Sequence, residues 1–174
     1  MEAHRFTGHF FTGAGPAWEN PGAAYDGDGE TLFRPTGRQC FFKFAVPESA
    51  ANDLMFRIKT ADACPPEGYV FRLAYGDEHS QTDICGGITF VPAANETFNV
   101  PFSYTVEDVE RIKAHCGSLL FGLKTGGDTA AGSMYEIEWL SPANGLWAGE
   151  KNAGTVYAGN TPAKAVYLGT DQIM

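Results

Sequence analysis

Basic residues are scarce in this chain of 174 residues, with 12 Lys and Arg against 21 Asp and Glu and a net charge of −9. Proteins that bind nucleic acid gather Lys and Arg on one face, and an anionic membrane surface attracts the same residues. The composition therefore argues against both partners. No apolar stretch approaches the roughly 20 residues that a membrane-spanning helix needs. The first ten residues, MEAHRFTGHF, have neither the basic start nor the apolar run of a signal peptide.

Metal-binding and catalytic motifs are equally scarce. The spacing of Cys40, Cys64, Cys85 and Cys116 contains no CxxC pair of the kind found in zinc sites. Their even number permits two disulfides, but without a signal peptide we expect free, mostly buried thiols in a reducing compartment. The sequence has no P-loop, no GxGxxG and no recognised nucleophile motif beside a histidine. We therefore expect a protein that is not an enzyme.

Alternation of apolar and polar residues with a period of two is the strongest pattern in the chain. It marks eight candidate strands before residue 141, at residues 6–11, 40–46, 54–59, 69–75, 87–91, 97–102, 119–123 and 135–139. Strands with one apolar and one polar face suit two antiparallel sheets packed face to face. Residues 1–142 are therefore predicted to form an all-β, eight-stranded antiparallel jelly-roll sandwich. A closed barrel would show the same alternation.

One short helix is predicted between the last strands. Thr105 is a preferred N-cap residue, and Asp108 stands at the third helical position, where a carboxylate completes a capping box. Val106, Val109 and Ile112 form a thin apolar stripe on the segment that follows. The pattern predicts two to three helical turns that cover one open end of the sandwich.

Residues 146–174 consist of three repeats, LWAGEKNAGT, VYAGNTPAKA and VYLGTDQIM. Each repeat has an aromatic residue and, two positions later, a glycine: Trp147, Tyr157 and Tyr167 with Gly149, Gly159 and Gly169. A period of ten fits one short strand and one turn, for which glycine supplies the conformation. Such strands bury little apolar surface alone. We therefore expect residues 143–174 to be an assembly tail whose aromatic and glycine positions form an interface between subunits; a meander that closes the protein's own sheet is the alternative.

The segment NPGAAYDGDGETLF at residues 20–33 is the most distinctive local motif. Asp26 and Asp28 alternate as at the start of an EF-hand loop, but Thr31 and Gly37 stand where that loop requires Gly and Glu. Carboxylates and carbonyls gathered in a glycine-rich turn suit Ca²⁺. An acidic surface turn explains the same residues equally well.

The residues Asn20-Pro21, Ala24, Asp26-Gly27-Asp28 and Thr31 resemble the opening of galactose-binding-like jelly rolls, which include discoidin domains and family-32 carbohydrate-binding modules. The resemblance implies a structural Ca²⁺ held by Asp26, Asp28 and Thr31, joined by Glu136 from the strand YEIEWL. Phe33 stands where the family usually has Trp. For sugar binding, our candidates are loop aromatics whose rings could stack on a pyranose: Trp18 and Tyr25, with Tyr69 and Trp147 as further candidates.

The tail adds a second resemblance. Repeats such as VYAGNTPAKAVYLGT, combined with an amino-terminal NPxxAYDGD segment, resemble those of virion and tail-associated proteins of tailed bacteriophages and prophages. This implies a non-enzymatic structural protein of the phage particle, a head decoration, tail or fibre component. Its partners would be other virion subunits in a homo-oligomer, assembled in the cytoplasm of the bacterial host. The alternative is a carbohydrate-binding module or a lectin-like receptor-binding domain that recognises a cell-surface glycan.

Overall fold

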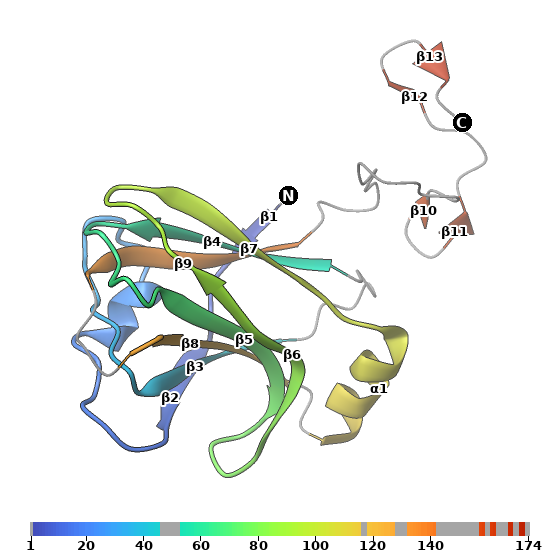
Figure 1. The fold of residues 1–174 in the computed structure, drawn as a ribbon. Helices are drawn as coiled ribbons and strands as arrows, with labels where there is room; N and C mark the ends of the chain where they lie inside the picture. Colours follow the sequence, from blue (N-terminus) through green and yellow to red (C-terminus); the bar gives the residue numbers. More distant parts are fainter. Residues whose placement is uncertain are drawn as a thin grey trace.

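The computed structural model describes residues 2–45, 53–115, 118–127 and 132–141, together with four two-residue strands of the tail. The body is built of two antiparallel sheets that face each other (Figure 1). The four-stranded sheet has the order β1 (Glu2–His4), β9 (Met134–Ser141), β4 (Asp53–Thr60) and β7 (Thr97–Ser103). The five-stranded sheet has the order β2 (Gly8–Thr12), β3 (Gln39–Ala45), β8 (Ser118–Thr125), β5 (Tyr69–Gly76) and β6 (Gln81–Phe90). The predicted antiparallel jelly-roll sandwich is confirmed.

The number of strands differs from the prediction of eight, because the first apolar segment is divided between the sheets. Strand β1 pairs with β9, whereas β2 pairs with β3 in the opposite sheet. Phe6 lies between the two strands and is buried in the core. Strand β6 starts six residues before the predicted segment 87–91, and its register against β5 shifts twice near Leu73. Such shifts interrupt the alternation from which the prediction was made.

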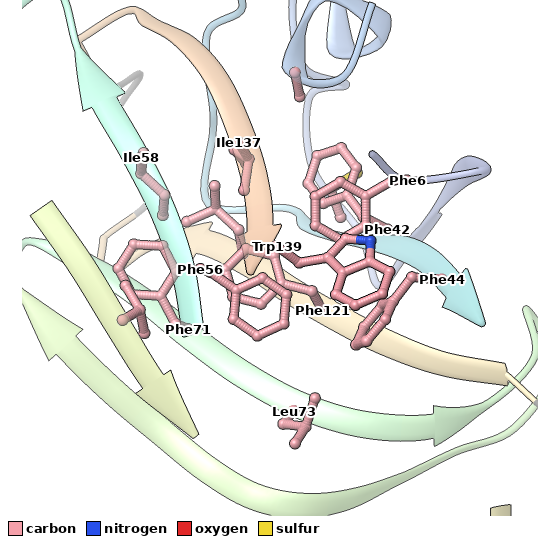
Figure 2. Close-up of a cluster of buried hydrophobic side chains, with 14 of the residues drawn as sticks. Phe6, Phe42, Phe44, Phe56, Ile58, Phe71, Leu73, Phe121, Ile137 and Trp139 are labelled. Atoms are coloured by element: carbon pink, nitrogen blue, oxygen red, sulfur yellow. The ribbon is translucent and has the colours of Figure 1, made fainter. Parts of the chain in front are cut away.

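The core between the sheets is dominated by aromatic rings. Phe56 of β4 and Phe121 of β8 stack with their ring centroids 4.0 Å apart, which joins the two sheets directly. Figure 2 shows these rings among side chains contributed by both sheets and by the segment that links β1 to β2. Large aromatic side chains bury much apolar area and pack in offset or edge-to-face pairs. This cluster is therefore the main source of hydrophobic stability in the body.

A helix lies at each end of the sandwich, α1 (Val106–His115) at one end and the short 3₁₀ helix η1 (Pro21–Ala24) at the other (Figure 1). The predicted capping box is confirmed: the Thr105 backbone N–H donates to Asp108 Oδ2 at 2.8 Å, and the Asp108 N–H donates to Thr105 Oγ1 at 3.2 Å. Ile112 is fully buried. Among the described residues, no helix is long and apolar enough to cross a membrane.

The thiols of Cys40, Cys64 and Cys85 are free, and Cys116 lies outside the described residues. Of these three thiols Cys40 is buried and Cys64 and Cys85 are partly accessible, so the expectation of mostly buried thiols is wrong for the described cysteines. Burial raises the pKa of the Cys40 thiol far above its usual value. Cys40 therefore behaves as a small apolar core residue and stays protonated at neutral pH.

The described part of the tail consists of two small antiparallel pairs of strands. Strand β10 (Tyr157–Ala158) pairs with β11 (Thr161–Pro162), and β12 (Tyr167–Leu168) pairs with β13 (Asp171–Gln172). Each of these two repeats thus contributes a pair of strands, where we predicted a single strand and a turn. Trp147, Gly149, Gly159 and Gly169 lie outside the described residues. The boundary near residue 142 and the role of the tail in oligomerisation stay predictions.

Candidate functional site

A groove of about 240 Å³ crosses the outer face of the five-stranded sheet, on the side away from the core. Strand alternation places every second residue of β3, β8 and β5 on this face. The pairs Phe41–Gly122 and Arg72–Gly122 set the register across the three strands. The groove is lined by Thr12, Gly13, Ala14, Gly37, Gln39, Phe41, Arg72, Gln81, Asp83 and Lys124.

Gly122 makes room for the side chains that flank the groove. It lies on β8, the central strand of the sheet, between Phe41 on β3 and Arg72 on β5. A Cβ atom at residue 122 would lie 2.7 Å from the Phe41 ring and 2.9 Å from the Gln39 Nε2 atom. Both distances are shorter than van der Waals contact, so only glycine permits these two side chains to lie across the strand. A glycine inside a strand often marks such a close approach.

A small cluster of buried apolar side chains lies beside the groove. Phe10 and Phe41 stack with centroids 5.5 Å apart, and with Ala74 and Leu120 they form a small buried cluster outside the main core. Lys43 Nζ lies 5.2 Å from the centroid of the Phe10 ring. Phe41 is only 2% exposed, so it supports the groove wall without offering a free ring face. The surface available to a ligand in the groove is therefore polar.

The polar side chains of the groove supply both donors and acceptors. Arg72 on β5 forms an ion pair with Asp83 on β6, and each side chain keeps about a third of its surface exposed. Lys124 extends from β8 into the same groove. Gln81 donates its amide N–H to the Asp77 carbonyl. A ligand that both donates and accepts hydrogen bonds would find partners for each.

Gln39 is the most constrained polar side chain of the groove. It is 8% exposed, and its Nε2 donates to the Cys40 carbonyl at 3.3 Å. Its Oε1 is buried and has no hydrogen-bond partner among the described residues. A buried polar atom without a partner costs about 1–3 kcal/mol, and buried amides in folded proteins nearly always find one. Because almost none of its surface is accessible, a ligand in the groove could donate to this oxygen only if the Gln39 side chain turned outward.

None of the residues of this groove was among our sequence-based site candidates. One signal was present in the sequence: Gly122 interrupts the outward positions of the strand that carries Leu119, Phe121 and Leu123. An interior strand glycine suggests a close approach of side chain or ligand. The pairing of Arg72 with Asp83 could not be foreseen, because the register shifts between β5 and β6 decide it.

The aromatic residues that we proposed as sugar platforms have other roles. Trp18 is 5% exposed, stacks on Phe33 with centroids 5.7 Å apart, and donates its Nε1–H to the Arg38 carbonyl at 2.9 Å. Tyr69 is fully buried. A buried ring has no free face for a pyranose, so the stacking role expected for Trp18 and Tyr69 does not agree with the structure.

Tyr25 is partly buried and holds the acidic loop against the body. Its hydroxyl lies 3.0 Å from His9 Nδ1, and its ring meets Phe6 and Phe42 edge-on. Burial raises the pKa of Tyr25 and lowers the pKa of His9, so both groups are neutral at pH 7. Tyr25 lies outside the groove described above. Its role in ligand binding stays a prediction.

The predicted calcium ligands are occupied by contacts within the loop. Asp26 Oδ1 accepts the Asp28 N–H at 2.8 Å, and Asp26 Oδ2 accepts the Thr31 hydroxyl at 2.8 Å. Asp28 Oδ1 accepts the Glu30 N–H at 3.1 Å. Among the described residues, no group of three or more His, Cys, Asp or Glu side chains is placed to hold a metal ion. These hydrogen bonds are those of a self-contained acidic turn.

Arg5 supplies a positive charge beside the fourth predicted ligand, Glu136. Its Nε lies 3.5 Å from Glu136 Oε1, and its guanidinium occupies the space that a side chain at Gly27 would need. Burial raises the pKa of Glu136, the Glu138 carboxylate raises it further, and Arg5 lowers it. Arg5 thus stands between the acidic loop and Glu136, and the arrangement does not fit a resident calcium ion.

Removing calcium with a chelator should therefore leave the melting temperature of this protein unchanged. A ligand that binds only the folded state raises stability, so a resident ion would be revealed by a fall of several degrees. The measurement is a thermal melt with EGTA and after restoring excess Ca²⁺. A reversible fall would show that the folded protein binds Ca²⁺ and would contradict this expectation.

Comparison with known proteins found no matching family model and no matching curated protein. Among solved structures, the chain is similar to a CBM32 of AlyQ in complex with 4,5-unsaturated mannuronic acid, at 12% identity and a TM-score of 0.43 over 82% of this chain and 100% of that chain. It is similar to the CBM22-1–GH10 modules of xylanase 10B from Clostridium thermocellum complexed with xylohexaose, at 11% identity and a TM-score of 0.47, covering 84% of this chain and 28% of that chain. A third similarity is to the xylan-binding module CBM15, at 11% identity and a TM-score of 0.42, over 75% of this chain and 94% of that module. Similarities this low do not show what the chain binds.

Proposed function

We propose that this chain is a non-catalytic binding protein that recognises a saccharide in the groove on the outer face of the five-stranded sheet. The observation that carries the proposal is the partly exposed Arg72–Asp83 ion pair beside Lys124, which gives the groove both hydrogen-bond donors and acceptors. A ligand that matches such a groove has to offer hydrogen-bond acceptors and donors at the same time.

A sugar hydroxyl matches this set of groups. It donates one hydrogen bond and accepts two, so one ring with several hydroxyls can donate to Asp83 while it accepts from Arg72 and Lys124. Hydrogen bonds that involve a charged side chain are stronger than those between neutral groups. The Phe41 ring is covered, so the groove would hold a saccharide by hydrogen bonds at its edges. The expected role in a phage particle is compatible with this activity, since a receptor-binding element on a particle also contacts glycans.

The test is calorimetric titration of the protein with a panel of neutral and acidic oligosaccharides. At least one should bind, and Arg72→Gln should weaken its affinity by roughly 10- to 100-fold, the value of a hydrogen bond to a charged group. Arg57→Gln is the matched control, because Arg57 forms an equivalent ion pair with Glu138 on the outer face of the other sheet. Absence of binding across the panel, or equal losses in the two variants, would contradict the proposal.

A second proposal concerns the tail, and a specific observation favours it. Two successive repeats form the same small antiparallel strand pair, although only two residues of each strand are paired. Strand pairs this short need further packing to be stable in water. We propose that the repeats acquire it by assembling with other copies of the chain, as expected for a virion subunit. Deleting residues 143–174 should then convert an oligomer into a monomer in light scattering; a full-length monomer would rule assembly out.

A further inference from the structure

We infer that the groove prefers a saccharide bearing a carboxylate, such as a uronic acid, over its neutral counterpart. This inference rests on the proposed function and names the class of ligand for the same groove. It depends on the balance of charge among the lining residues. Arg72 and Asp83 form an ion pair and cancel each other. Lys124 therefore gives the groove a net positive charge, since no described carboxylate lies within ion-pair distance of it.

The positions of the two cations define where a carboxylate would bind. Lys124 on β8 pairs in register with Val70 on β5, and Arg72 follows two residues later on the same face. Diagonal neighbours of this kind lie roughly 7–8 Å apart, with long side chains that reach into the space between them. A carboxylate placed there can accept from the Lys124 ammonium and from the Arg72 N–H groups that Asp83 leaves unused.

The local charge is opposite to that of the whole protein. The chain carries a net charge of −9, so an anionic ligand gains nothing from the overall field. Preference for an anion therefore has to come from groups at short range, and Lys124 is the one that the groove provides. The Asp83 carboxylate would still require a hydroxyl donor on the same ligand, because an ionised carboxylate only accepts hydrogen bonds. An acidic sugar carries both groups, whereas a simple anion carries one.

The experiment uses matched pairs of oligosaccharides with the full chain. Oligomers of galacturonic, glucuronic and mannuronic acid are compared with their carboxyl-reduced forms, which are oligomers of galactose, glucose and mannose. These partners keep the ring stereochemistry and differ in charge. At least one acidic oligomer should bind roughly tenfold more tightly than its neutral partner, the difference between a charged and a neutral hydrogen bond.

The variant Lys124→Gln should reduce this acid-to-neutral ratio towards one. The control Lys59→Gln removes the same charge from the outer face of the other sheet, where Lys59 Nζ lies 4.5 Å from the Tyr135 ring centroid, and should leave the ratio unchanged. Equal affinity for acidic and neutral partners, or a ratio unaffected by Lys124→Gln, would overturn this inference and leave saccharide binding in place. Binding of no oligosaccharide at all would overturn both.

Discussion

Replacing Phe121 by Ala should lower the free energy of unfolding by about 3–5 kcal/mol, the usual cost of truncating a buried Phe. Phe121 is fully buried, and its ring lies 4.0 Å from that of Phe56 and 5.7 Å from that of Phe71. Because Phe56 lies on the opposite sheet and Phe71 on the neighbouring strand β5, the cavity cannot be closed by moving a single side chain. In a domain of this size, each kcal/mol corresponds to about 2–4 °C in melting temperature.

Val91→Ala is the control for Phe121→Ala, because Val91 is 64% exposed and its truncation removes little buried surface. Chemical denaturation of both variants gives the comparison directly. If Phe121→Ala cost less than 1 kcal/mol, the two sheets would have to be held together by something other than the aromatic cluster of Figure 2.

Replacing Gly122 by Ala should abolish saccharide binding, or weaken it at least tenfold, and cost about 1–3 kcal/mol of stability through overpacking. The added methyl group would lie 2.7 Å from Phe41 Cε1 and 2.9 Å from Gln39 Nε2, so both side chains must move. Gln39 and Phe41 both line the groove, so their displacement changes the shape of the site that the saccharide would enter. Binding is measured by titration well below the melting temperature of the variant.

The matched control for this variant is Gly86→Ala. Gly86 lies on β6 of the same sheet, and a Cβ atom there would have no neighbour within 4 Å. This variant should keep both its stability and its affinity. A Gly122→Ala protein that binds saccharide as well as wild type would show that the ligand site lies elsewhere on the molecule.

The class of fold could be predicted from the sequence because it depends on local patterns. Alternation along Leu54–Ile58 and Tyr69–Tyr75 requires strands with one buried face, and two such faces have to pack together. The helix was equally local, since Thr105 and Asp108 lie three residues apart and cap each other. The helix lies at an end of the sandwich because it connects β7 to β8, which belong to different sheets.

The groove was decided by contacts between residues far apart in the chain. Gln39, Arg72 and Lys124 reach one face because β8 inserts between β3 and β5, an order that alternation does not specify. The same packing buried Trp18, which in the sequence had the character of an exposed loop aromatic, and placed Arg5 beside Glu136, where we had predicted calcium.

The repeats of residues 146–174 show the same division. Their period and their aromatic and glycine positions can be read directly in the sequence, and so can the prediction that they serve assembly. The strand pairing within two of the repeats emerged only in three dimensions. Periodicity along a chain determines which residues share a face, because side-chain direction follows the local backbone. Strand order and register determine which faces meet, because they depend on packing energy summed over the whole domain, and in this protein they decided the candidate site.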